Sequence, residues 1–273
     1  MKNERYIEIG WLAWNVKRVT VGEVELGVDG CGWGGDTGEM EMHGNIGVLV
    51  AAAGSGVRFG GGDKLLVKLG GESILRRAVG LFAGRVRVMV VVTSAERIGV
   101  YREHLGSIDG TELGFVVGGK ERWESVMLGL RYLAQLAEAP RFVAVHDAAR
   151  ALTPPGVIEE AFGAVQSFGS ALPGVLEPAT LKRKGHDGTV LETVDRRGLY
   201  QAQTPQCFEL AKLLEGYESL ERQGLTADLT DDAQVYERMG RPVRMTAGSA
   251  LNLKITTPED VELARAIVAG KGR

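Results

Sequence analysis

The sequence predicts an α/β fold, with a mostly parallel β-sheet that is covered by helices on both faces. Short apolar runs alternate along the chain with segments that carry apolar residues at helical spacing. One run, Val86–Val92, is almost continuously β-branched, as expected for a strand that is buried on both faces. Segments rich in small or charged residues directly follow three of the apolar runs, and ligands bind at the carboxyl ends of strands in such sheets.

The first half of this alternation runs from residue 46 to residue 136. Apolar residues spaced as on one helix face indicate the helices, and compact apolar runs indicate the strands between them. The expected strands are Ile46–Val50, Val86–Val92 and Leu113–Val117, and the expected helices are Ser73–Phe82, Ala95–Leu105 and Glu121–Leu136.

The second half continues the pattern and then interrupts it. A strand Phe142–Val145, a helix Pro155–Phe168 and a strand Ala171–Leu176 come first, and prolines are tolerated in the first turn of that helix. Thr180–Arg183 and Val190–Val194 then flank a polar turn, which predicts an inserted β-hairpin arm at about residues 178–200. The expected fold is Rossmann-like. Its last expected elements are the helices Cys207–Gln223 and Thr230–Met239, a strand Val243–Thr246 and a final helix with Thr257 as its N-cap.

Residues 1–44 differ from the rest of the chain. Residues 27–38 are rich in glycine, which is typical of a loose, disordered extension or linker. A short strand pair within residues 6–28 is the alternative. We therefore expect an N-terminal extension over residues 1–44 and one domain, large enough for a substantial core, over residues 45–273.

Composition narrows the classes of function. The 273 residues carry a net charge of −3, so no overall attraction to nucleic acid or to an acidic membrane is expected. Cys31 and Cys207 are far apart and form no CxxC pair, which argues against a zinc site and for two free thiols. The chain has no apolar run of the ~18–20 residues that a membrane helix needs and no signal-peptide pattern, so we predict a cytoplasmic protein.

A glycine-rich loop follows the first strand. Ala51–Gly56 is built from small residues, and the cations Arg58 and Lys64 follow it. Successive backbone N–H groups of such a loop form a concavity for anions, which suits a triphosphate. Phe59 stands where a dinucleotide-binding loop has its third glycine, and no Gly-Lys-Ser/Thr run occurs. From the loop alone, a surface turn remains an equal alternative.

Two further motifs follow predicted strands. His146-Asp147-Ala148-Ala149-Arg150 offers a carboxylate for Mg²⁺ or a ribose hydroxyl, small residues that leave room, and an arginine that can grip a phosphate. A surface Asp–Arg ion pair is the alternative. Residues 118–125 (Gly-Gly-Lys-Glu-Arg-Trp-Glu-Ser) expose backbone to a base or sugar, or form only a glycine turn before a helix.

These pieces resemble one family when they are taken in order. The segments A-A-G-x-G-x-R, a following lysine, G-G-x-x-R-x-x-S, H-D-A-A-R, T-V-D-R, T-P-Q and N-x-K-x-T are similar to those of the 2-C-methyl-D-erythritol 4-phosphate cytidylyltransferases. The resemblance spans about residues 45–269. It implies that a substrate phosphate attacks the α-phosphorus of CTP and that pyrophosphate leaves.

The resemblance also implies residue roles. It makes Arg58 and Lys64 the catalytic cations at the α-phosphate and the leaving pyrophosphate, and Arg196 and Lys254 the catalytic cations that orient the polyol phosphate. The implied nucleotide-binding residues are Ala52, Ala53, Gly54, Gly56, Gly119, Arg122, Ser125, Asp147 and Ala148. The implied substrate-binding residues are Asp147, Arg150, Thr180, Arg196, Thr204 and Lys254, with Asp147 as the Mg²⁺ ligand.

The same resemblance implies a homodimer in which the arm reaches the neighbouring site. The chain departs from the family pattern at Asp63, where proline is usual, and at Lys120, where an acid is common. Two alternatives stay open: a ribitol 5-phosphate cytidylyltransferase, and a non-catalytic nucleotide-binding relative. Retention of the charged groups at the predicted strand ends speaks against the second.

Overall fold

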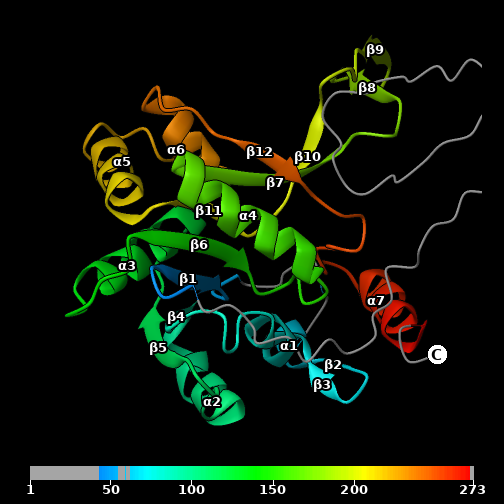
Figure 1. The fold of residues 1–273 in the computed structure, drawn as a ribbon. Coiled ribbons are helices and arrows are strands. Elements are labelled where there is room, and N and C mark those ends of the chain that lie inside the picture. Colours follow the sequence, from blue (N-terminus) through cyan, green and yellow to red (C-terminus); the bar gives the residue numbers. More distant parts are fainter. Residues whose placement is uncertain (1–42, 55–58, 60–61, 271–273) are drawn as a thin grey trace, which may run out of the picture. The chain divides into compact units, whose positions relative to one another are not determined.

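The computed structural model describes residues 43–54, 59 and 62–270 (Figure 1). Two units separate along the chain, Met1–Glu39 and Met40–Arg273, and the first lies outside the described residues. The expected strand pair within residues 6–28, Cys31, and the loop residues Gly56 and Arg58 also lie outside them. The boundary predicted at residue 44 stays a prediction.

A sheet of eight described strands forms the centre of the second unit. Its strand order is β10-β7-β11-β6-β1-β4-β5, and β12 also pairs with β7. The strands β6, β1, β4 and β5 are parallel neighbours, which confirms the predicted mostly parallel sheet. The bounds are β1 Ile46–Ala51, β4 Val88–Thr93, β5 Glu112–Val117, β6 Phe142–Asp147, β7 Ser170–Leu176, β10 Tyr200–Ala202, β11 Gln206–Glu209 and β12 Met245–Ala247.

Helices cover both faces of this sheet, as predicted (Figure 1). Because side chains alternate along a strand, Val48 and Val50 of β1 face one apolar core and Leu49 faces the other. The helices that contribute buried residues to the first core are α1 (Ile74–Gly80), α2 (Ala95–Leu105), α4 (Pro155–Phe168) and α7 (Pro258–Gly270). The helices that contribute buried residues to the second core are α3 (Arg122–Ala134), α5 (Leu210–Arg222) and α6 (Ala233–Arg238).

Helix α3 lies unusually close to the sheet. A Cβ atom at Gly129 would lie 2.5 Å from Leu49 Cδ1 and 2.7 Å from Val92 Cγ2, so only glycine fits there without a shift. The close approach fixes the first turn of α3 above the carboxyl ends of β1 and β4. The residues that begin this helix are therefore held in place at the edge where ligands are expected.

The predicted helix start at Cys207 is wrong. Cys207 lies in β11, an antiparallel strand between β6 and β7, where it is opposite Ala144 and Ala171. A strand of four residues shows no periodicity that would separate it from the start of the following helix, and β10 was missed for the same reason. Cys207 is fully buried and unpaired, and burial raises the pKa of its thiol.

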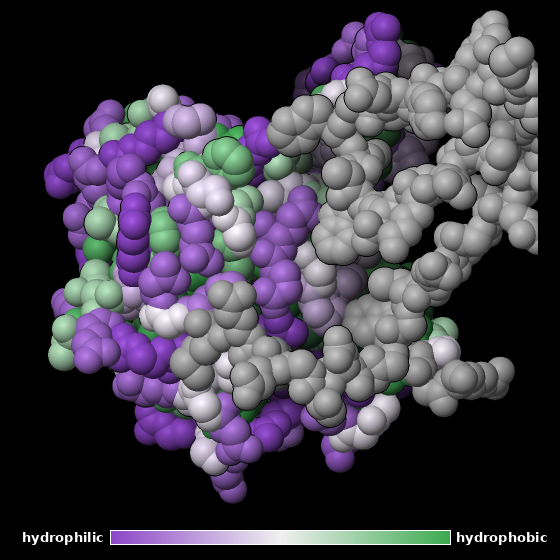
Figure 2. Space-filling model, viewed as in Figure 1, coloured by the Kyte–Doolittle hydropathy of each residue, from purple (hydrophilic) through white to green (hydrophobic). Residues whose placement is uncertain are grey.

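The predicted β-hairpin arm is present. Its strands β8 (Leu181–Lys184) and β9 (Val190–Val194) pair with each other as a separate two-stranded sheet that stands away from the main sheet in Figure 1. Val190 and Leu191 of the arm are 61% and 64% exposed. The face drawn in Figure 2 is mostly hydrophilic where it is described, with apolar residues in scattered spots.

Three short elements connect β1 to α1. They are the 3₁₀ helix η2 (Lys64–Leu66) and the paired strands β2 (Lys68–Leu69) and β3 (Glu72–Ser73). Across the described part of the chain, the helices all fall short of the length and apolar character that a bilayer crossing requires. A cytoplasmic location stays a prediction from the sequence.

Candidate active site

A cavity of about 320 Å³ opens at the carboxyl ends of β1, β5 and β6. Each of these strands ends in a segment that the sequence had singled out, and the parallel order of the sheet brings the segments to one edge. We call this the first cavity. It is lined by Ala51, Ala52, Ala53, Gly54, Lys64, Leu65, Gly119, Lys120, Glu121, Arg122, Ser125, Asp147, Ala149 and Lys254.

A second cavity of about 210 Å³ adjoins the first. The two cavities share the charged residues Arg122, Asp147 and Lys254, which therefore form a common wall. The other residues that line the second cavity are Arg150, Ala202, Thr204, Gln206, Thr230 and Asp231. Two adjoining spaces with one charged wall can hold two reactants side by side.

Asp147 is the centre of the common wall. Its carboxylate lies 2.8 Å from Lys254 Nζ, 3.7 Å from Arg150 Nε and 3.8 Å from Arg122 Nη2. Burial alone would raise the pKa of Asp147, but the cations of Arg122, Lys254 and Arg150 outweigh it and hold the pKa well below its usual value. Asp147 is therefore ionised at neutral pH.

Two buried residues that the sequence did not predict, Asp232 and Tyr217, fix the position of Arg122. Its guanidinium donates to both carboxylate oxygens of Asp232, at 3.1 and 2.6 Å, and the Tyr217 hydroxyl donates to Asp232 at 2.6 Å. Asp232 is fully buried. Burial lowers the pKa of Arg122, yet Asp232 and Asp147 reverse this effect and raise it. The helix predicted over Thr230–Met239 includes Asp232, whereas α6 begins at Ala233 with Asp232 as its N-cap residue, and the acidic pair Asp231-Asp232 was the only signal in the sequence.

The segment that carries Lys254 is tied to the loop after β6. The Asn252 side chain accepts from Thr153 Oγ1 at 2.8 Å and donates to the Thr204 carbonyl at 2.9 Å, and Ile255 N donates to the Ala149 carbonyl at 2.9 Å. Lys64 Nζ in turn donates to the Ile255 carbonyl at 3.0 Å. One extended segment thus supplies Lys254 and positions Lys64.

The start of α3 shapes the other side of the first cavity. A Cβ atom at Gly118 would lie 2.6 Å from Ser125 Oγ, so the glycine lets the loop lie against the helix. Glu124 accepts from the backbone N–H groups of Lys120, at 2.6 Å, and Glu121, at 3.2 Å, as part of a capping box. The Lys120 backbone is therefore used to fix the loop.

The comparisons with known proteins identify the family. A sequence model of the 2-C-methyl-D-erythritol 4-phosphate cytidylyltransferase family matches residues 46–270 of this chain. The chain belongs to this family. The matched residues include every residue that lines the two cavities.

Relatives of that name are similar over nearly their whole length. The 2-C-methyl-D-erythritol 4-phosphate cytidylyltransferase of Saccharopolyspora erythraea is 42% identical over 226 residues, which cover 81% of this chain and 98% of the relative. The protein of the same name from Rhodopirellula baltica is 38% identical over 241 residues, which cover 84% and 97%. The crystal structure of the Thermus thermophilus protein of that name is 30% identical, with a TM-score of 0.67, and covers 84% of this chain and 100% of that chain.

Most of the residues that the family resemblance implied lie together in the two cavities, but some do not. Thr180 and Arg196 are exposed on the arm segment and line neither cavity, and Arg196 donates to the Pro178 carbonyl. Ala148 is buried and donates through its N–H to the Ala51 carbonyl at 3.1 Å, so it supports the first cavity without lining it. Gly56 and Arg58 lie outside the described residues.

His146, the first residue of the H-D-A-A-R motif, supports the site from below. Asp147 N–H donates to Thr204 Oγ1 at 3.1 Å, and that hydroxyl lies 3.1 Å from His146 Nδ1. His146 Nε2 lies 3.3 Å from the Arg150 carbonyl, which can only accept, so the proton belongs on Nε2 and Nδ1 accepts from Thr204. Burial lowers the pKa of His146 to about 4, which keeps the ring neutral in this chain of hydrogen bonds.

The His146 pKa predicts a loss of stability in acid. Because the pKa is about 4 in the folded protein and ordinarily 6.5, the unfolded chain binds more protons between these values and stability falls as the pH falls. We expect His146 to lower the free energy of unfolding by about 2 kcal/mol between pH 7 and pH 5. Urea denaturation at both pH values should show a smaller pH-dependent loss in His146→Gln than in the wild type. An equal loss in both proteins would contradict this assignment.

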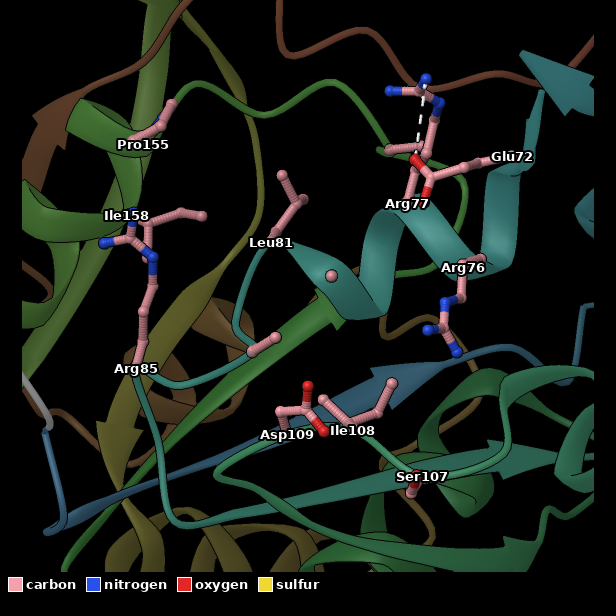
Figure 3. Close-up of a pocket in the computed structure, with 13 residues that line it drawn as sticks. Glu72, Arg76, Arg77, Leu81, Arg85, Ser107, Ile108, Asp109, Pro155 and Ile158 are labelled. Carbon is pink, nitrogen blue, oxygen red and sulfur yellow. Dashed lines mark ion pairs between the residues drawn. The ribbon is translucent and has the colours of Figure 1, made fainter. Parts of the chain in front are cut away.

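A larger cavity of about 680 Å³ lies away from this site (Figure 3). It is bordered by α1, the connection from α2 to β5 and the start of α4, and it contains three arginines. Each arginine has a partner within the protein: Arg77 pairs with Glu72 at 3.7 Å, Arg85 pairs with Glu159, and Arg76 donates to the Leu105 carbonyl. The guanidinium groups point in different directions in Figure 3, so we do not place a reactant there.

Proposed function

We propose that this protein transfers the cytidylyl group of CTP to 2-C-methyl-D-erythritol 4-phosphate, giving 4-diphosphocytidyl-2-C-methyl-D-erythritol and pyrophosphate. The observation that carries the proposal is the pair of cavities that share Arg122, Asp147 and Lys254. The first cavity has the backbone-rich lining that a nucleotide needs, and the second has the cations that a sugar phosphate needs. The family to which the chain belongs carries out this reaction as its name states.

The nucleotide fits the first cavity by its shape and chemistry. The backbone of Ala52–Gly54 would cradle the phosphates, and Gly119 and Ser125 would face the base. Asp147 would accept from a ribose hydroxyl at the common wall. Lys64 enters this cavity from η2 and would offset negative charge on the α-phosphate and the leaving pyrophosphate. Arg58, outside the described residues, would act beside it.

The polyol phosphate would occupy the second cavity. Arg150 Nε is buried there and makes no hydrogen bond within the described part of the chain, although Asp147 lies 3.7 Å away. An unsatisfied buried donor costs about 1–3 kcal/mol, and a phosphate oxygen would relieve that cost. Lys254 and Thr204 line the same cavity and complete its polar surface.

The chemical step needs positioning more than acid–base catalysis. A phosphate oxygen of the acceptor attacks the α-phosphorus of CTP, a new P–O bond forms, and the bond from the α-phosphorus to the bridging oxygen breaks with its electron pair on pyrophosphate. The attacking phosphate is already anionic at neutral pH, so no residue has to remove a proton. The task of Lys64 and Lys254 is to hold the two anions together and to offset the charge that develops.

A divalent cation fits the common wall. Mg²⁺ typically binds one or two protein carboxylates together with substrate phosphates, and Asp147 supplies one ionised carboxylate beside the place proposed for the triphosphate. No group of three or more potential metal ligands occurs among the described residues, so the substrate phosphates would supply the other ligands. When bound, Mg²⁺ would offset triphosphate charge and make pyrophosphate a better leaving group.

A direct assay tests the function. The full chain is incubated with CTP, Mg²⁺ and either 2-C-methyl-D-erythritol 4-phosphate or ribitol 5-phosphate, and pyrophosphate release is measured. We expect turnover with the first acceptor. Turnover with ribitol 5-phosphate alone would replace the proposed substrate, and no turnover with either acceptor would favour the non-catalytic alternative.

We also propose that two copies of the chain act together through the arm. Thr180 and Arg196 are exposed on the arm segment and reach neither cavity of their own chain, while Val190 and Leu191 expose apolar surface on β9. A dimer that buries this surface would bring Arg196 to the second cavity of the neighbouring copy. Light scattering at assay concentration should then report a dimer, and an active monomer would contradict the proposal.

Mixed dimers test whether Arg196 acts on the neighbouring site. We expect Arg196→Ala to raise KM for the polyol phosphate and also to lower kcat, since a cation that grips this anion is lost. If Arg196 serves the partner's site, mixing the Arg196→Ala and Lys64→Ala proteins forms dimers with one intact site. With random mixing, about half of the dimers are mixed and each has one intact site of two, so about a quarter of wild-type activity should return. No recovery would mean that Arg196 acts within its own chain.

A further inference from the structure

Asp63 stands directly before Lys64 and follows the three glycines at residues 60–62. Its backbone is extended (φ −94°, ψ 102°), and its Oδ1 accepts from Leu65 N–H at 3.1 Å, which caps the 3₁₀ helix η2. In the sequence, Asp63 stands out only as a departure from the family pattern. In the structure it fixes the start of the element that carries Lys64.

The other carboxylate oxygen of Asp63 is held by helix α2. Tyr101 Oη donates to Oδ2 at 2.7 Å, and Arg97 Nε lies 3.5 Å from the same atom. Arg97 also donates through Nη1 to the Gly54 carbonyl at 3.1 Å. Arg97 therefore contacts Gly54, which precedes residues 55–62, and Asp63, which follows them.

We propose that Asp63, Arg97 and Tyr101 form a positioning cluster that sets Lys64 and Gly54 at the correct separation for the α-phosphate of CTP. The inference rests on the proposed function, since it concerns the placement of a catalytic lysine. None of the three residues lines either cavity, so each acts through another residue. Arg97 and Tyr101 of α2 thus contact the residues on either side of positions 55–62, Gly54 and Asp63.

The physical need for such a cluster comes from the loop and the lysine. Glycine gives a backbone wide conformational freedom, and a lysine ammonium sits on a flexible stem with many rotamers. A misplacement of about 1 Å at a reacting centre can cost about 10²-fold in rate. One guanidinium contacts the Gly54 carbonyl and the Asp63 carboxylate, and it thereby holds Gly54 and Asp63 at a set separation.

The position of the cluster is restricted because the Tyr101 side chain is buried. Tyr101 is fully buried, and burial together with the hydrogen bond to Asp63 raises the pKa of its hydroxyl, so it remains a donor at any working pH. The hydroxyl donates to Asp63 Oδ2 and also interacts with the Arg97 side chain, so the three side chains contact one another. The Asp63 side chain is therefore restricted to the orientation that also caps η2.

Three variants and one control test the proposal. Arg97→Gln removes the link to Gly54, Tyr101→Phe removes only the hydroxyl, and Asp63→Asn keeps an acceptor for Leu65 N–H while it removes the charge. The control is Arg102→Gln on the same helix, whose guanidinium lies over the Phe115 ring, 5.3 Å from its centroid. We expect kcat to fall roughly 10- to 100-fold in Arg97→Gln and Asp63→Asn, and less in Tyr101→Phe.

Binding and stability measurements separate positioning from a merely structural role. Isothermal titration with CTP should show an affinity that changes less than kcat, and KM for the polyol phosphate should stay at its wild-type value. In the double variant Asp63→Asn/Tyr101→Phe, the fold-loss of kcat should be smaller than the product of the fold-losses in the two single variants, because both substitutions remove the same contact. A kcat that stays within about twofold of wild type in Arg97→Gln, or an equal loss in Arg102→Gln, would overturn the proposal.

The outcome is distinguishable from a failure of the proposed function. If the wild-type protein turned over no acceptor, the function would fail before any variant was compared. If the wild type is active and the variants lose kcat only in proportion to a lowered thermal midpoint, the function stands and the positioning cluster is rejected.

Discussion

Replacing Lys64 with alanine is expected to lower kcat by about 10²- to 10³-fold. Lys64 lines the first cavity, and its ammonium is directed by the Ile255 carbonyl at 3.0 Å. In the proposed reaction, negative charge moves toward pyrophosphate as its bond to the α-phosphorus breaks, and the ammonium offsets that charge most strongly at this point. The loss should therefore appear in kcat, with little change in KM for the polyol phosphate.

Steady-state pyrophosphate release over a range of CTP concentrations measures this effect. Lys68→Ala is a suitable control, because Lys68 is an exposed lysine on β2 that lines neither cavity. We expect the control to behave as the wild type. If Lys64→Ala kept a kcat close to that of the wild type, the role assigned to this lysine would be wrong, whatever the effect on CTP binding.

The arrangement of the site could be predicted from the sequence because it depends on the order of strands. Apolar runs marked β1, β5 and β6, and the segments that follow them had to meet at one edge of a parallel sheet. The pairing of Asp147 with Lys254 did not follow from strand order. Their positions are 107 residues apart in the sequence, and only the packing of the segment around Asn252 against the loop after β6 joins them.

The supporting residues could not be predicted from local patterns. Asp232 and Tyr217 lie on different elements from Arg122, and Arg97 and Tyr101 lie on α2, a helix with only two buried residues. Their role depends on which side chains face each other after folding. The proposed role of Arg196 at a neighbouring site was first implied by the family resemblance, and the exposure of Arg196 outside both cavities agrees with it.

Replacing Asp232 with alanine is expected to lower the free energy of unfolding by about 3 kcal/mol. Asp232 is fully buried and accepts two hydrogen bonds from Arg122 and one from Tyr217. Its removal leaves a largely buried guanidinium without its bidentate partner, and a buried unpaired charge is far more costly than a lost surface ion pair. We place the value at the lower end of the usual range because the Arg122 side chain is 30% exposed.

Urea denaturation at pH 7 measures this loss, and Asp228→Ala is the matched control. Asp228 also pairs with an arginine, Arg238, at 2.8 Å, but its side chain is 76% exposed, so its removal should change stability little. The Asp232 variant should also bind CTP more weakly, because Arg122 would be free to turn toward Asp147, 3.8 Å away, and into the first cavity. Equal stability losses in the two variants would show that burial of the Arg122–Asp232 pair is not what makes it important. In that case the wall between the two cavities would be fixed by Asp147 and Lys254 alone.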